Sequence, residues 1–188
     1  MLKWNFGCAG NIICQNKKTL NKDQEIGNLV RFGKIKYHLL HAELHYDILQ
    51  KKILCERFIK TKDGQLPEDY KVYCFNGEAK FVLVCTGRGE GIRPKFYFFD
   101  RDWRLIRLNK QGKEAPEDFT IPKPEGINKL FEYAECLSKP FPFVRADFYL
   151  ENGQTIFGEL TFTPGGGFDR GYLPEGDRYL GSLIKLPN

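Results

Sequence analysis

Two pairs of polar residues in the last third of the chain have the types and spacing of a metal-binding face. Arg145 and Asp147 are two residues apart, and so are Glu159 and Thr161. Residues at this spacing share one face of a β-strand. Two carboxylates beside an arginine suit Mg²⁺ and phosphate, because Mg²⁺ takes oxygen ligands and a guanidinium pairs with phosphate oxygens. By spacing alone, an ordinary hairpin with solvated charges is an equal alternative.

The turn between these two segments decides whether the four residues meet. A two-residue loop at 152–153 puts Glu159 on the face opposite to Asp147, unless a bulge restores the phase. A three-residue loop at 151–153 brings both carboxylates to one face, with Gly153 in the left-handed position of a G1 bulge. We predict the three-residue loop.

Composition fits one domain with an anionic ligand. The chain has 188 residues and a formal charge of +5, with charges of both signs spread along it. That length allows one sizeable core. A solvated basic surface is the simplest explanation of the charge, and the charge alone leaves nucleic acid open. The sequence has no basic tail. A mildly basic domain fits an anionic ligand such as a nucleotide, and we predict no nucleic-acid partner.

The cysteines do not have metal-site spacing. They stand at positions 8, 14, 55, 74, 85 and 136, with no Cys-x-x-Cys pair, and the three histidines lie elsewhere. A zinc site is therefore not expected. We expect reduced thiols and a cytoplasmic protein. The start lacks the apolar stretch of a signal peptide, and no segment has the length of a membrane span.

The remaining pattern predicts an α+β fold. Apolar runs at 69–75 and 79–86 flank Asn76-Gly77, which is the strongest hairpin signal in the chain. Further strands are predicted at 2–6, 12–15, 53–59 and 95–99. Helices are predicted within 22–49 (two, broken near Gly33), over 125–139 and over 175–186.

The chain resembles the ATP-grasp superfamily, most closely the TupA-like group of teichuronopeptide biosynthesis. The segments that carry the resemblance are LKWNFGCAGNIIC, ILCERFI, DYKVYCFNG, LSKPFPFVRADFYLENGQTIFGELTFTPGGGF and PEGDRYLGSLIKLP. The resemblance implies an ATP-grasp core with two lobes of antiparallel sheet plus helices, residues 1–59 and 60–188. It also implies that the N-terminal domain of ATP-grasp enzymes is absent, so either the chain is a fragment or a partner supplies that domain.

The resemblance implies that the first lobe binds ATP. Lys3 matches the lysine that reaches the phosphates. The loop that closes over the phosphates matches Gly7, Gly10 and Asn11. The hinge strand, whose backbone reads adenine, matches Glu56, Arg57 and Phe58.

The second lobe is expected, by the same resemblance, to hold phosphate and metal. The basic residues that match phosphate contacts or catalytic positions are Lys71, Arg88 and Arg145. The residues that match Mg²⁺ ligands are Asp147, Glu159 and Thr161, where Thr161 replaces the usual Asn. A hydroxyl can still coordinate the metal or hold a metal-bound water.

The implied function is an ATP- and Mg²⁺-dependent carboxylate–amine ligase that works through an acyl phosphate. Its setting would be the biosynthesis of bacterial cell-surface polysaccharide or teichuronopeptide. Its partners would be a nucleotide and a small carboxylate, amine or glycan-linked acceptor. Two alternatives stay open: a kinase with the same fold, and a truncated, non-catalytic nucleotide-binding subunit of a polysaccharide-assembly system.

Overall fold

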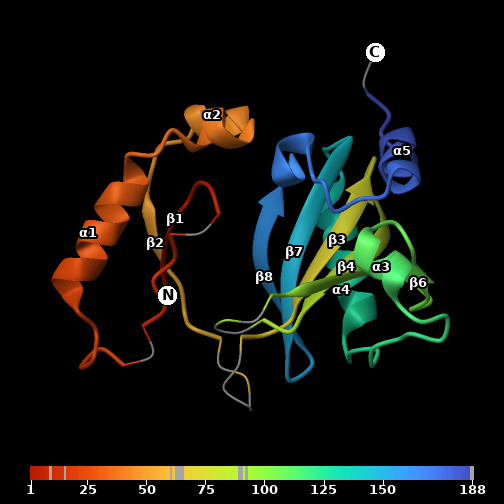
Figure 1. Cartoon of the computed structure of the whole chain (residues 1–188), viewed down its shortest axis with the longest axis horizontal. Coiled ribbons are helices and arrows are strands. Elements are labelled where there is room, and N and C mark those ends of the chain that lie inside the picture. Colours follow the sequence, from red (N-terminus) through yellow and green to blue (C-terminus); the bar gives the residue numbers. More distant parts are fainter. Residues whose placement is uncertain are drawn as a thin grey trace. The chain divides into compact units, whose positions relative to one another are not determined.

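The computed structural model describes residues 1–8, 10–14, 16–59, 61, 66–88, 91 and 93–186. The chain forms two compact units, whose elements are labelled in Figure 1. The smaller unit comprises Met1–Ile59 with Gly165–Gly167, and the larger comprises Lys60–Pro164 with Phe168–Asn188.

The smaller unit contains a two-stranded antiparallel sheet, formed by β1 (Leu2–Trp4) and β2 (Ile53–Cys55). Both strands are shorter than predicted. In the predicted strand at 12–15, the described residues 12–14 form a single bridge, between Leu2 and Ile12, and position 15 lies outside the described residues. In a two-stranded sheet, each strand has only one hydrogen-bonded partner. The pairing of β1 with β2 ends at Trp4, before the glycine loop begins.

Three short helices complete this unit: α1 (Lys22–Gly33), α2 (Tyr37–His41) and the 3₁₀ helix η1 (Leu44–Asp47). The predicted break near Gly33 is confirmed. Asn21 caps α1, because its side chain accepts a hydrogen bond from the backbone N–H of Gln24. The indole Nε1 of Trp4 donates to the carbonyl of Leu29 at 3.0 Å, which ties α1 to β1.

The larger unit contains a six-stranded antiparallel sheet in the order β6-β5-β4-β3-β7-β8. Its strands are β3 (Asp69–Phe75), β4 (Glu78–Thr86), β5 (Lys95–Phe99), β6 (Leu105–Ile106), β7 (Phe143–Glu151) and β8 (Gln154–Thr161). The predicted first hairpin is confirmed. Asn76 and Gly77 form its turn with φ angles of 52° and 80°, the positive values of a type I′ turn.

Different helices cover the two faces of this sheet. α4 (Ile127–Ser138) packs its apolar stripe on one face, against residues such as Val72, and confirms the predicted helix. α5 (Pro174–Ser182) contributes Leu180 to a second apolar cluster, which contains Tyr73. Val72 and Tyr73 are consecutive in β3, so the two clusters lie on opposite faces.

Two short elements of this unit were not predicted, β6 and α3 (Lys110–Glu114). Elements of two and five residues are too short to give a periodic signal. Asn109 caps α3 by accepting a hydrogen bond from Gly112 N at 2.9 Å, and its own amide donates to the carbonyl of Phe96 in β5. The 3₁₀ turn η2 (Pro164–Gly167) follows β8.

The turn between β7 and β8 corrects the prediction. Glu151 pairs with Gln154, so the loop has only two residues, Asn152 and Gly153. Their φ angles are 51° and 71°, which again fits a type I′ turn. The predicted three-residue loop with a G1 bulge was therefore wrong, although Gly153 does have the positive φ expected of it.

A bulge further along the hairpin restores the phase. The register shifts beside Asp147, where Gly158 is an extra residue in β8. As a result Asp147 lies opposite Glu159, and Arg145 lies opposite Thr161. The two acidic residues are thus direct partners across the hairpin, as the metal-site hypothesis requires.

Two general properties bear on the expectations from composition. None of the helices that the structure describes combines the length and hydrophobicity needed to cross a bilayer. All six cysteines are free thiols. Burial raises the pKa of both Cys74 and Cys85 to about 11.

Candidate active site

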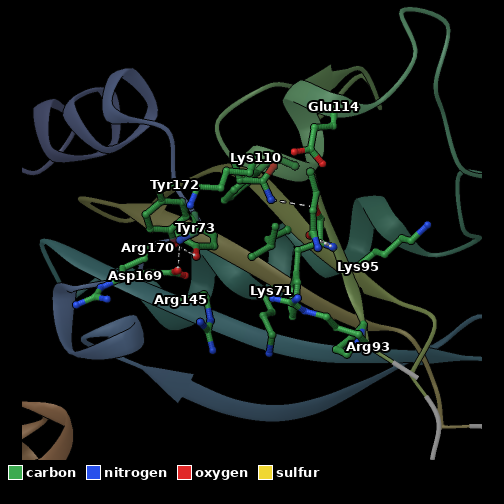
Figure 2. Close-up of a pocket in the computed structure, with 17 residues that line it drawn as sticks. Lys71, Tyr73, Arg93, Lys95, Lys110, Glu114, Arg145, Asp169, Arg170 and Tyr172 are labelled. Atoms are coloured by element: carbon green, nitrogen blue, oxygen red, sulfur yellow. Dashed lines mark hydrogen bonds between the residues drawn. The ribbon is translucent and has the colours of Figure 1, made fainter. Parts of the chain in front are cut away.

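Four charged side chains form a cluster on the face of the sheet opposite to α4. Asp69 and Lys71 come from β3, Arg145 and Asp147 come from β7, and Lys71 is the direct partner of Asp147 in the ladder. Each pair is separated by one residue, so both members leave their strand on the same side. Figure 2 shows Lys71 and Arg145 extending from neighbouring strands to the same side of the sheet.

Asp147 is the centre of this cluster and is only 3% exposed. Arg145 holds it with two bonds, Nε to Oδ1 and Nη2 to Oδ2, both at 2.7 Å. Lys71 Nζ donates to Oδ2 at 2.7 Å as well. Such charge-assisted, bidentate contacts are the strong class of hydrogen bond, and they fix the carboxylate in one orientation.

Lys71 lies between two carboxylates. Its Nζ is 2.7 Å from Asp147 Oδ2 and 2.6 Å from Asp69 Oδ2. Burial alone lowers the pKa of Lys71, but the charges of Asp147 and Asp69 outweigh burial, and the net pKa is raised above the ordinary value. Lys71 is therefore a protonated ammonium at neutral pH. An ammonium has three donors, so one remains for a ligand after these two contacts.

Asp69 extends the cluster toward Arg88. Arg88 Nη1 lies 4.0 Å from Asp69 Oδ2 and donates to the carbonyl of Pro67 at 3.1 Å. The other oxygen, Asp69 Oδ1, is buried without a hydrogen-bond partner among the described residues. A buried acceptor without a partner costs free energy. This position is therefore suited to a donor that the described residues do not supply.

The proposed metal ligands partly fit Mg²⁺. Thr161 Oγ1 accepts a hydrogen bond from Arg145 Nη2 at 3.1 Å, and Glu159 is exposed opposite Asp147. No group of three or more His, Cys, Asp or Glu side chains that could hold a metal occurs in the described part of the chain. Mg²⁺ is commonly bound by one or two carboxylates together with substrate phosphates. The donor set therefore fits a metal that arrives with a nucleotide, and not an all-protein cage.

A pocket of about 860 Å³ opens beside Lys71 and Arg145. It lies between β3, β5, α3 and the segment 169–172, and Figure 2 shows its lining. Six of the side chains that line it are cationic, and two are acidic, Glu114 and Asp169. The apolar part of the lining includes Phe98 and Tyr172, and Tyr172 shares a hydrogen bond of 2.5 Å with Tyr73.

The other residues singled out from the sequence lie in the smaller unit. Lys3 Nζ forms an ion pair with Glu56 Oε1 at 2.8 Å. The backbone N–H of Glu56 donates to the carbonyl of Met1, and the Met1 ammonium donates to the carbonyl of Glu56. These backbone groups of Glu56 are therefore engaged within the unit, while Arg57 and Phe58 follow the end of β2.

The glycine loop has the backbone that its composition suggests. Gly7 and Gly10 have φ angles of 73° and 67°, in the left-handed region that favours glycine. A Cβ at Gly7 would come within 2.7 Å of the Tyr37 ring, and one at Gly10 within 2.6 Å of the Phe32 ring. Asn11 is exposed. The glycines are thus needed for packing as well as for backbone freedom.

Two features of the larger unit were missed by the analysis of the sequence. Asp69 is a member of the charged cluster, and the spacing Asp69-x-Lys71 on a strong strand already placed both on one face. The basic pocket has no comparable spacing pattern in the sequence. It depends on the short helix α3 and on the segment 169–172, which come from distant parts of the chain and have no periodic pattern.

Comparison with known proteins places the chain in a family. The family model described as TupA-like ATPgrasp matches residues 1–185. A crystal structure of D-alanine–D-alanine ligase from Bacillus anthracis, complexed with ATP, is 14% identical, with a TM-score of 0.42. The match covers 80% of this chain and 45% of that ligase, so the chain spans less than half the length of its structural relative. No curated protein matches the chain.

Proposed function

This chain belongs to the TupA-like ATP-grasp family, and we propose that it is an ATP- and Mg²⁺-dependent carboxylate–amine ligase. Family membership supports ligase-type use of ATP. The acyl-phosphate route, the metal and the residues in each role are our proposal. They rest on one observation, the buried cluster in which Lys71 and Arg145 both contact Asp147.

The cluster presents N–H donors where phosphate oxygens would bind. Lys71 has one donor left after its contacts with Asp69 and Asp147. Arg145 uses Nε and Nη2 for Asp147 and Thr161, and Nη1 makes none of these three bonds. Donors that are fixed in advance by buried contacts stabilise developing charge without reorganising during the reaction.

The reaction that we propose has two steps. A carboxylate oxygen of the substrate attacks the γ-phosphorus of ATP, the bond from that phosphorus to the bridging oxygen breaks, and ADP leaves. The nitrogen of an amine then attacks the acyl carbon, phosphate leaves, and the nitrogen loses a proton to solvent. The protein needs no covalent nucleophile, because positioning and charge neutralisation supply most of the catalysis in phosphoryl transfer.

We assign residues to three tasks. The phosphates would contact Lys71, Arg145 and Arg88, together with Lys3 and the loop that contains Gly7, Gly10 and Asn11. Adenine would meet the hinge at Glu56, Arg57 and Phe58, where the backbone of Arg57 and Phe58 carries the recognition. Mg²⁺ would be held by Asp147, Glu159 and Thr161, and when bound it neutralises phosphate charge.

The biological setting is also part of the proposal. We propose teichuronopeptide or another bacterial cell-surface polysaccharide as the pathway, with synthesis in the cytoplasm. The TupA-like name of the family supports the pathway. The acceptor would be a small carboxylate, an amine or a glycan-linked acid. A partner that completes the acceptor site is consistent with this assignment.

The experiment is to incubate the protein with Mg-ATP, a panel of amino acids and uronic acids, and hydroxylamine. Hydroxylamine traps an acyl phosphate as a hydroxamate, so a ligase yields hydroxamate and ADP. ³¹P NMR in the absence of hydroxylamine shows free phosphate for a ligase and a stable phosphoester for a kinase. Mg-ATP binding without turnover under every condition would favour the non-catalytic nucleotide-binding subunit.

A further inference from the structure

The basic pocket carries more positive charge than the charged cluster uses. Lys71 and Arg145 line it, but they are largely buried and already paired with carboxylates. Four further cations line it, and we call them the rim cations: Arg93, Lys95, Lys110 and Arg170. None of these four side chains forms an ion pair or hydrogen bond with another described residue. These four cations are therefore available to an anionic ligand.

The acidic residues of the pocket and of the charged cluster do not cancel the positive charge of these cations. The lining contains two carboxylates, Glu114 and Asp169, and the inner cations are paired with Asp69 and Asp147. Six cations against these four carboxylates leave an excess of two positive charges. The excess lies at the rim, where all four cations are exposed. A ligand with a single negative group would leave part of it uncompensated.

The pocket extends away from the proposed metal ligands. In the sheet order β5-β4-β3-β7-β8, the carboxylates Asp147 and Glu159 lie on the β7–β8 side of Lys71. Three of the rim cations come from the other side, Arg93 from just before β5, Lys95 from its start and Lys110 from α3. The fourth, Arg170, comes from the segment that precedes Tyr172. Neither Glu159 nor Thr161 lines the pocket. Lys71 and Arg145 are thus shared between a metal side and a pocket side.

We propose that this pocket binds the carboxylate substrate, and that this substrate is an organic acid with at least two anionic groups. The reacting carboxylate lies at Lys71 and Arg145, and the second anionic group is held by the rim cations. The volume of about 860 Å³ is in the range of pockets for organic ligands, and its apolar lining suits a carbon skeleton. The inference rests on the proposed function, because it takes Lys71 and Arg145 as the place of reaction.

The test uses three acids that share a six-carbon polyol skeleton and differ at one end. D-Gluconate has one carboxylate, D-glucarate has a second carboxylate, and 6-phosphogluconate has a phosphate in its place. Their affinities are measured by isothermal titration, with the whole chain both free and saturated with Mg²⁺ and a non-hydrolysable ATP analogue. We expect glucarate or 6-phosphogluconate to bind at least about tenfold more tightly than gluconate. The tighter of the two identifies the second group as carboxylate or phosphate.

Charge reversal at the rim locates the binding. Lys110→Glu combined with Arg170→Glu should weaken the doubly anionic acid by about tenfold or more, and leave the affinity for Mg-ATP within about twofold. The matched control, Lys123→Glu with Lys129→Glu, changes two exposed lysines of the same unit outside the pocket and should alter neither affinity. Thermal unfolding of both double variants confirms that they are folded.

The outcomes separate this inference from the proposed function. Equal affinity for the three acids, or no binding of any of them, overturns the inference even if Mg-ATP binds normally. Loss of Mg-ATP binding in the rim variant makes the pocket part of the nucleotide site, which also overturns it. Failure of the wild-type protein to bind Mg-ATP defeats the proposed function, while the titrations of the free protein still decide whether the pocket prefers two negative groups.

Discussion

Lys71 Nζ lies between Asp69 and Asp147, 2.6 Å from one carboxylate and 2.7 Å from the other. The two acids come from different strands, so the lysine joins β3 to β7 as well as holding the charges apart. Removing it would leave two buried carboxylates facing each other. This relationship gives Lys71 a role in stability beside the role in phosphate binding that we propose, and the two roles have separate tests.

Binding is tested with Lys71→Ala. If the remaining donor of Lys71 meets a terminal phosphate, the change should weaken ATP by about tenfold and AMP by less than about threefold, because AMP lacks those phosphates. Isothermal titration with both nucleotides measures the difference. Lys80→Ala, on the neighbouring strand β4, is the control. An equal loss for ATP and AMP would remove Lys71 from the phosphate site.

Stability is tested by its dependence on pH. The pKa of Lys71 is raised in the folded protein above the ordinary value of 10.5. The contribution of Lys71 to the free energy of unfolding is therefore complete below that pH. It is lost as the pH rises toward the pKa of the folded state, because in this range only the folded state keeps the proton. The free energy of unfolding, measured in urea from about pH 9 to about pH 11, should fall more steeply for the wild type than for Lys71→Met. Parallel curves would contradict the proposed pairing.

The two proposed metal ligands differ in burial, which allows binding and folding to be separated. Asp147→Asn removes the charge from a buried cluster and should cost about 3 kcal/mol of unfolding free energy as well as Mg-dependent ATP binding. Glu159→Gln, at an exposed position, should abolish the same binding and leave the urea midpoint unchanged. Titration with ATP, with and without Mg²⁺, and urea unfolding of both variants provide the data. Normal Mg-ATP affinity in both would rule out the metal site.

Much of the larger unit could be predicted from the sequence because its signals are local. Alternating apolar residues predicted β3 and β4, and Asn76-Gly77 predicted their turn. The spacing of Arg145 and Asp147 predicted that both lie on one face of a strand. Each of these depends on neighbours in the chain. These predictions do not depend on which strands pair with each other.

The errors arose where distant residues decide the outcome. The turn at 151–153 was predicted from its composition, whereas its length is set by pairing along the whole of β7 and β8. The rim cations were not found, because Arg93, Lys110 and Arg170 meet in one pocket only after three separate segments have folded. The pairing of Lys71 with Asp147 was invisible for the same reason, since the two residues are 76 positions apart.

The bulge at Gly158 provides the last prediction. A Cβ at this position would lie 3.0 Å from the carbonyl oxygen of Asp147 and 3.4 Å from the ring of Tyr149, so a side chain must push the two strands apart. Gly158→Val should therefore destabilise the hairpin by about 1–3 kcal/mol and weaken Mg-ATP binding, although Gly158 itself meets no ligand. Urea unfolding and titration with Mg-ATP measure the two effects.

Deletion of Gly158 is the sharper comparison. It removes the bulge, but Glu159 then takes the place opposite Asp147 in a regular ladder, so both carboxylates stay on one face. The deletion should retain Mg-ATP binding that Gly158→Val loses. Gly153→Ala, at the positive φ of the turn, should lower stability by about 1 kcal/mol without changing nucleotide affinity, because the turn lies at the far end of the hairpin from Thr161. If the deletion abolished binding while the valine variant kept it, the register of β7 and β8 would not be what places the two acids together.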